Sequence, residues 1–178
     1  FEYGEGVKKD LHKALEYYKI AAQKGFDVSQ NNLGLLYSEG VVVKRDLKKA
    51  FDYFKLAADQ GYDAAQYQLG LAYQNGEGVD KDLKKAFNYF KLSADQGYLD
   101  SINEIGMSYF DGHGVEKNLE QSFKYFKIAS DKGLDQAQHN IGIAYQMGYG
   151  VNPDLQKAIE HYKLAADQGN SDAQANLA

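Results

Sequence analysis

Glycine recurs in this chain at a fixed interval, and that interval constrains the fold more than any other feature of the sequence. Gly34, Gly70, Gly106 and Gly142 follow one another at steps of 36 residues. All eighteen glycines of the 178-residue chain fall on four places of the same frame. Because self-similarity with a period of about 20 to 50 residues is typical of repeat architectures, the sequence predicts a stack of similar structural units.

Each copy of the frame contains two amphipathic segments with helical spacing. In the copy at 65–100, Leu69, Ala72 and Tyr73 share one face of a first helix, which Gly76 ends. A glycine inside that helix costs about 1 kcal/mol relative to alanine, so its recurrence predicts close approach of the next helix. A capping residue precedes the second helix in every copy, namely Asp10, Asp46, Asp82, Asn118 and Asp154.

No linker or change in composition separates the copies. We therefore expect one elongated domain over residues 1–178, whose core forms between neighbouring repeats. The chain begins in the second half of one copy and ends early in another, so we expect it to be a fragment of a longer array. The predicted boundaries are a partial repeat at 1–28, full repeats at 29–64, 65–100, 101–136 and 137–172, and the start of a further repeat at 173–178.

The repeated pattern A-x-x-x-L-G-x-x-Y-x-x-G-x-G-V-x-x-D-x-x-K-A-x-x-Y-F-K-x-A-A-x-x-G is similar to the Sel1-like repeat, a relative of the tetratricopeptide repeat. The resemblance covers essentially the whole chain. It implies an all-α fold, an α/α right-handed superhelical solenoid of about five helix-turn-helix repeats of 36 residues. It also implies a non-enzymatic role as a protein-protein interaction scaffold or adaptor.

One loop departs from that pattern. Val42 stands where the second loop glycine, such as Gly78, stands in other copies. A β-branched residue is strained at positive φ, so we expect the loop at residues 40–43 to differ in conformation.

The composition argues against several function classes. A net charge of −5 does not favour nucleic-acid binding, and the chain has no cysteine for disulfides or thiolate metal sites. No apolar run approaches the roughly 20 residues that span a bilayer, so we expect no direct membrane insertion. The glycine loops follow helices rather than strands, unlike phosphate-binding loops. The four histidines, His12, His113, His139 and His161, show no metal-ligand spacing, and we predict no catalytic, cofactor-binding or metal site.

Lysines recur on the second helices at 48, 49, 55, 84, 85 and 91, with aspartates interleaved. This pattern favours a solvated face over a basic binding surface.

The variable places of the first helix are the candidate partner-binding residues. By analogy with tetratricopeptide geometry, the concave face takes side chains two before, two after, five after and six after the repeated leucine or isoleucine. Amide, aromatic and methionine side chains among them are typical of surfaces that bind extended peptides. The predicted set is Asn31, Leu35, Ser38, Glu39, Tyr67, Leu71, Gln74, Asn75, Asn103, Met107, Phe110, Asp111, His139, Ile143, Gln146 and Met147.

Three kinds of partner follow from these residues. The favoured hypothesis is a peptide or another protein on the concave face. The alternative is a carbohydrate or cell-envelope polymer, which Tyr67 and Phe110 and the envelope-linked relatives implied by the resemblance would suit. Self-association through uncapped repeat ends is a further possibility, since terminal repeats normally cover those surfaces.

Overall fold

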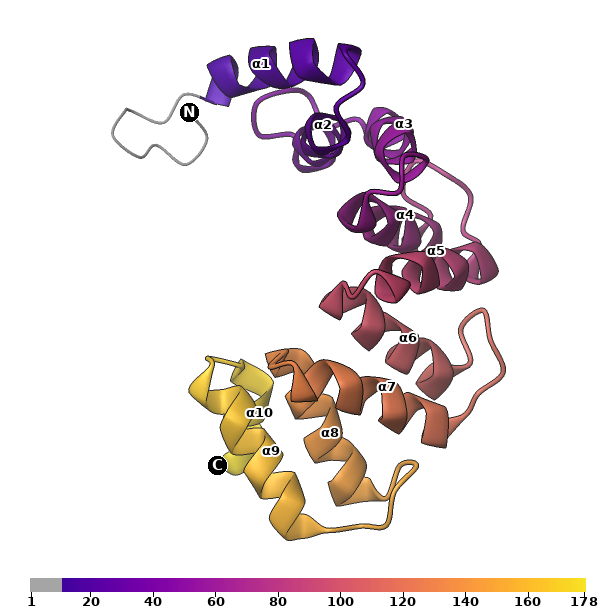
Figure 1. The fold of residues 1–178 in the computed structure, drawn as a ribbon. Coiled ribbons are helices and arrows are strands. Elements are labelled where there is room, and N and C mark those ends of the chain that lie inside the picture. Colours follow the sequence, from indigo (N-terminus) through magenta and orange to yellow (C-terminus); the bar gives the residue numbers. More distant parts are fainter. Residues whose placement is uncertain (1–10) are drawn as a thin grey trace. The chain divides into compact units, whose positions relative to one another are not determined.

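The computed structural model describes residues 11–178, and within them the chain is all-α (Figure 1). The cap expected at Asp10 and the beginning of the partial repeat lie outside the described residues. The helices are α1 (Leu11–Gln23), α2 (Asp27–Glu39), α3 (Leu47–Ala58), α4 (Asp63–Asn75), α5 (Leu83–Asp95), α6 (Leu99–Asp111), α7 (Leu119–Asp131), α8 (Asp135–Met147), α9 (Leu155–Asp167) and α10 (Ser171–Leu177).

The chain forms two compact units, residues 1–89 and 90–178, with the boundary inside α5. In the first unit α2 packs against both α1 and α3, and α3 packs against α4. In the second unit α7 packs between α6 and α8, and α9 packs between α8 and α10. Each unit therefore builds its core from helices that follow one another in the sequence. The single elongated domain stays a prediction.

The predicted caps of the second helices are confirmed within the described residues. The side chains of Asp46, Asn118 and Asp154 each accept a hydrogen bond from the backbone N–H three residues later, and Asp82 does the same over 3.0 Å. These bonds lower the pKa of the three aspartates below its ordinary value. Because the neutral amide of Asn118 makes the same bond, the place requires an acceptor rather than a charge.

Close helix approach at the buried glycine is also confirmed. The ring of Phe54 on α3 fills the space that a Cβ at Gly34 on α2 would occupy. A Cβ at Gly106 would lie 2.6 Å from the ring of Phe126. The ring of Tyr162 lies equally close to a Cβ built at Gly142. The first helices α2, α6 and α8 thus each meet an aromatic ring of the following helix at a place where only glycine fits without a shift.

A second aromatic contact joins the two helices of each full repeat. Tyr37 stacks on Tyr53 with ring centroids 5.7 Å apart, and Tyr109 stacks on Tyr125 at the same distance. In the last full copy His161 replaces the tyrosine and stacks on Tyr145 at 5.8 Å. The flat ring is therefore retained while its chemistry changes.

The loop containing Val42 differs from its counterparts, as predicted. Gly78 and Gly150 have φ values of 71° and 70°, whereas no residue other than glycine has a positive φ within residues 11–178. In the Val42 loop the Nε of Arg45 donates to the carbonyl of Ser38 over 2.9 Å. Val42 therefore lies in a loop whose backbone is not left-handed at this residue.

Candidate functional site

Three of the four candidates that lie two before the repeated leucine are buried. Asn31, Asn103 and His139 are each more than nine-tenths buried, and Tyr67 is half-buried. The Nδ2 of Asn140 on α8 donates to the Oδ1 of Asn103 on α6 over 3.0 Å. The Nε2 of His139 likewise lies 3.0 Å from the Nδ2 of Asn176 on α10, whereas the Oδ1 of Asn31 is buried without a hydrogen-bond partner. Asn103 and His139 therefore meet polar atoms of the next first helix rather than bulk water.

The other candidate columns keep more accessible surface. Leu35, Leu71, Met107 and Ile143 are half-buried, as are Ser38, Gln74 and Phe110. Gln146, Glu39, Asn75, Asp111 and Met147 are exposed, although Gln146 accepts a hydrogen bond from the Tyr162 hydroxyl over 2.5 Å. These columns therefore combine partly accessible apolar side chains with exposed polar ones.

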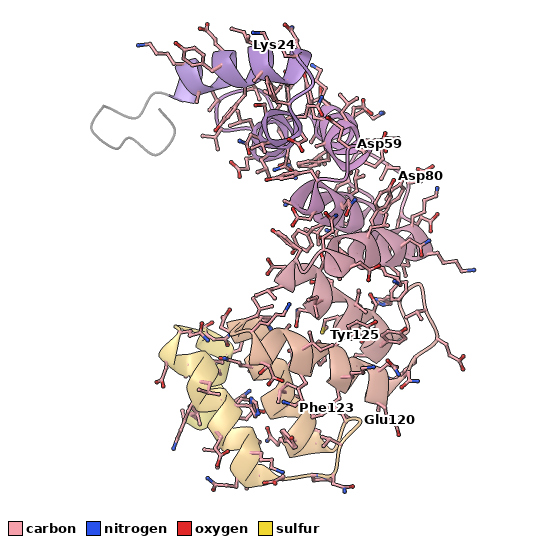
Figure 2. The ribbon with its side chains drawn as sticks, in the orientation of Figure 1. Lys24, Asp59, Asp80, Glu120, Phe123 and Tyr125 are labelled. Carbon is pink, nitrogen blue, oxygen red and sulfur yellow. The ribbon has the colours of Figure 1, made fainter. Side chains whose placement is uncertain are left out.

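In the second unit these columns meet in an apolar pocket of about 120 Å³ between α6, α7 and α8. Three predicted residues, Met107, Phe110 and Ile143, line it. Phe123 of α7 (Figure 2) forms another wall, and its ring meets Tyr145 edge to face with centroids 5.4 Å apart. The remaining lining residues are Ser122, Phe126, Asn140, Ala144 and Tyr149.

Phe110 has aromatic and cationic neighbours at this pocket. Its ring centroid lies 5.2 Å from that of Tyr149, with the planes inclined at 67°. The Nζ of Lys117 lies over the same ring, 5.4 Å from its centroid. Such contacts favour one orientation of the ring at the pocket.

The first unit contains the same pocket two repeats earlier, with a volume of about 90 Å³. Leu71, Phe51 and Phe54 line it where Ile143, Phe123 and Phe126 line the other. Three shared places differ in chemistry, since Ala50 stands for Ser122 and, with a larger change, Ser38 stands for Phe110 and Glu77 for Tyr149. The frame therefore creates the pocket, and the variable residues add two aromatic side chains to the second copy and two polar ones to the first.

Tyr149 is the pocket residue that the sequence analysis missed, because the candidates were confined to the first helix. It lies between Gly148 and Gly150, at the loop place that holds Val41, Glu77 and His113 in other copies. Variation among these four residues was the available signal. In three of these loops a glycine with positive φ flanks this place on each side, so the backbone is kept while the residue between the glycines changes.

The lysines of the second helices are exposed and have acidic neighbours. Lys55 pairs with Asp59 at 2.8 Å and Lys91 with Asp95 at 2.9 Å, each one helical turn apart, and Lys48 pairs with Asp52. Exposed pairs of this kind are worth about 0.3–0.5 kcal/mol. They neutralise the positive charge of the face, which confirms the expectation that acids interleave the lysines.

Two histidines are held in environments that disfavour the protonated ring. Burial lowers the pKa of His139, against a smaller raising effect from Asp172. Burial also lowers the pKa of His161, with a further contribution from Lys127 and opposition from Asp131 and Glu160. The Nδ1 atoms of both rings are buried without a hydrogen-bond partner, which agrees with this direction.

Acidification should therefore destabilise the second unit. The folded-state pKa of each ring lies below its ordinary value of 6.5, so the unfolded chain binds more protons in that range. The free energy of unfolding should fall as the pH drops below about 6.5 and level off below the folded-state pKa. Urea unfolding of wild type and the double variant His139→Asn/His161→Tyr, measured from about pH 7 to about pH 5, tests this. The substituted residues come from the equivalent places Asn103 and Tyr125, and an equally steep loss in the double variant would contradict the assignment.

Neither a metal centre nor a membrane span is found in the described part of the chain. Residues 11–178 contain no cluster of three or more His, Cys, Asp or Glu side chains placed to hold a metal ion. None of their helices is long and apolar enough to cross a membrane.

Solved structures similar to this chain carry helical repeats. A protective antigen of uropathogenic Escherichia coli strains, described as displaying an SLR fold, is 38% identical over 97% of this chain with a TM-score of 0.87. A Sel1 repeat protein from Oxalobacter formigenes is 37% identical over 97% of this chain and 70% of its own, with a TM-score of 0.91. Helicobacter pylori cysteine rich protein B is 24% identical over 76% of this chain and 98% of its own, with a TM-score of 0.57, and shows the fold alone.

This chain spans 37% of the length of the Escherichia coli antigen. No match was found among curated proteins. The model of the Sel1 repeat matches five successive segments, residues 1–26, 27–62, 63–98, 99–134 and 135–170. Its frame begins two residues before the predicted repeat boundaries, in agreement with first helices that start at Asp63 and Asp135 rather than at 65 and 137. The chain is an all-α helical solenoid that belongs to the Sel1 repeat family.

Proposed function

We propose that this chain is an adaptor that binds an extended segment of a protein partner through the pocket of the second unit. Sel1 repeat proteins are in general protein-protein interaction modules rather than enzymes. The observation that carries the proposal is the exchange of Ser38 and Glu77 in the first pocket for Phe110 and Tyr149 in the second. Both changes replace a polar side chain by an aromatic one at an accessible place.

The dimensions and lining of the second pocket favour a single apolar anchor side chain. A volume of about 120 Å³ suits one aliphatic or aromatic side chain rather than a folded surface. Its walls come from Met107, Phe110 and Ile143, and methionine and aromatic residues are enriched where binding energy concentrates. Asp111, which follows Phe110 and is exposed, would contact the segment beside the anchor.

The experiment compares the two pockets within one chain. Peptides selected by wild type from a random-peptide display library should share an apolar anchor, and their affinity can be measured by fluorescence anisotropy. The variant Phe110→Ser/Tyr149→Glu gives the second pocket the residues of the first and should weaken binding by about tenfold or more. Because the same residues already occupy the same frame places in the first unit, this variant is expected to fold.

Two controls separate this pocket from a general effect on the array. Met147→Ala removes an exposed apolar side chain that does not line the pocket and should change the affinity by less than the double variant does. The circular-dichroism melt of each variant reports whether the fold is intact. Unchanged affinity in a folded Phe110→Ser/Tyr149→Glu variant would overturn the pocket assignment. Selection of no peptide, together with binding on a glycan array, would favour the carbohydrate alternative instead.

A further inference from the structure

The pocket of the first unit combines a buried apolar lining with an accessible polar one. It has a volume of about 90 Å³ and takes its walls from α2, α3, α4 and the loop after α4, which follow one another along the chain (Figure 1). Its buried lining residues are all apolar, namely Ala50, Phe51, Phe54 and Ala72. Its polar lining residues keep accessible surface, and they are Ser38, Gln68, Asn75 and Glu77. The pocket is therefore apolar in its depth and polar at its rim.

Glu77 is the charged residue of this rim, and the backbone on both sides of it is fixed. Its N–H donates to the carbonyl of Ala72 over 2.9 Å, at the end of α4. Gly76 and Gly78 flank it with φ values of 77° and 71°. Gly78 packs so closely on the carbonyl of Leu47 that a Cβ there would overlap it. The carboxylate of Glu77 is thus presented to the pocket from a loop that is held at α3 and at α4.

No cation of the described residues forms an ion pair with Glu77, although two basic side chains lie near the pocket. The Nζ of Lys48 lies 5.6 Å from the centroid of the Phe51 ring, and its charge is paired with Asp52. The Nε of Arg45 donates to the carbonyl of Ser38 over 2.9 Å. Within residues 11–178 the partly buried carboxylate of Glu77 therefore has no ion-pair partner.

These features match a side chain with an apolar stem and a cationic head. Lysine and arginine bury their methylene stems against apolar surface and keep the charge at a polar edge. The rings of Phe51 and Phe54 provide the apolar surface, and the small volume suits an unbranched stem. The carboxylate of Glu77 and the side-chain carbonyls of Gln68 and Asn75 are acceptors for the N–H groups of the head.

We infer that the pocket of the first unit binds the side chain of a lysine or arginine in a segment of a protein partner. The pocket of the second unit provides the contrast, because Tyr149 stands for Glu77 and Phe110 for Ser38, and none of its lining residues is acidic. The two pockets thus select opposite chemistry with one frame. The inference does not rest on the proposed function, since each pocket is built within its own unit.

n-Butylammonium, which reproduces the lysine side chain beyond Cα, is the probe for this pocket. In two-dimensional NMR of the full chain it should shift the backbone amide signals of Leu71 and Glu77 with a dissociation constant on the order of 1–10 mM. 1-Butanol has the same stem without the charge, and it should bind about fivefold or more weakly. Binding of n-butylammonium should also weaken as the salt concentration rises, because part of the attraction is electrostatic.

The variant Glu77→Gln removes the charge and keeps the shape of the side chain. It should weaken n-butylammonium binding by about fivefold or more, because a hydrogen bond between charged groups is lost. The variant is expected to fold, since the same loop place holds Val41, His113 and Tyr149 in other copies. Glu39→Gln is the matched control. It removes the same charge from an exposed residue of α2 that does not line the pocket, and it should change the affinity by less than about twofold.

Peptide selection extends the test to a protein segment. Peptides selected by wild type from a random-peptide display library that lose affinity in Glu77→Gln, but not in Glu39→Gln, should contain a lysine or arginine. Replacing that residue by norleucine should weaken binding by about fivefold or more. Equal binding of n-butylammonium and 1-butanol, unchanged binding in Glu77→Gln, or tolerance of norleucine would each overturn the inference. Failure of the proposed function would instead show as unchanged peptide affinity in Phe110→Ser/Tyr149→Glu, which leaves the n-butylammonium result as it is.

Discussion

We expect Gly106→Ala to destabilise the wild-type protein and to stabilise the Phe126→Ala variant. A Cβ at position 106 would lie 2.6 Å from the ring of Phe126, which is itself buried, so the ring or the helix must shift. Overpacking of this kind costs about 1–3 kcal/mol, whereas alanine gains about 1 kcal/mol over glycine inside a helix. In the wild-type background the clash outweighs the gain in helix propensity.

The Phe126→Ala variant removes the obstacle. Loss of the buried ring should itself lower the free energy of unfolding by about 3–5 kcal/mol. In that background Gly106→Ala enters the space that the ring has left and keeps its gain in helix propensity, about 1 kcal/mol. Urea unfolding of the four proteins, followed by circular dichroism, gives the double-mutant cycle. An effect of Gly106→Ala with the same sign in both backgrounds would show that the ring does not impose the glycine.

The second large effect is expected at Gly150, in the loop after α8. Its φ of 70° is unfavourable for alanine by about 1–2 kcal/mol, and a Cβ there would overlap the backbone carbonyl of Leu119. Because backbone atoms cannot rotate away as a side chain can, the loop or α7 must shift, at a further cost of about 1–3 kcal/mol. Gly150→Ala should therefore lower the free energy of unfolding by about 2–5 kcal/mol in total.

Gly133→Ala is the matched control for this prediction. Gly133 also has a positive φ, 93°, but no atom lies within 4 Å of a Cβ built there. Gly133→Ala should therefore lower the free energy of unfolding only by the cost of alanine at a positive φ, about 1–2 kcal/mol. Thermal and urea unfolding of the two variants separate the terms, and equal losses would mean that the contact with Leu119 relaxes at no cost.

The residues that every copy shares were the predictable part of this fold. Glycine is unfavourable inside a helix, so its recurrence at 34, 106 and 142 indicated that another helix approaches closely there. Aromatic rings of the following helices occupy that space. The acceptors at 46 and 118 indicated helix starts for an equally local reason, the unpaired N–H groups of a first turn. The buried glycines and the helix caps can therefore be predicted from the residues of a single repeat.

The pocket could be predicted only in part, because its walls come from different repeats. Met107 and Phe110 were found from their places on the first helix, but Tyr149 lies 39 residues beyond Phe110 in a loop whose path the pattern does not specify. The burial of Asn103 was missed for a related reason. Its exposure depends on Asn140 of the next first helix, and a single sequence does not show how closely successive repeats approach.

The contact between the buried glycine and its ring also bears on how the chain folds. Gly34 and Phe54 are 20 residues apart, as are Gly106 and Phe126, so each contact closes a short segment. Short loops close with little loss of entropy, and chains rich in local contacts fold quickly. A helix pair can therefore acquire its native packing soon after it leaves the ribosome, before later repeats are synthesised. Any of several repeats can serve as the nucleus from which order spreads to its neighbours.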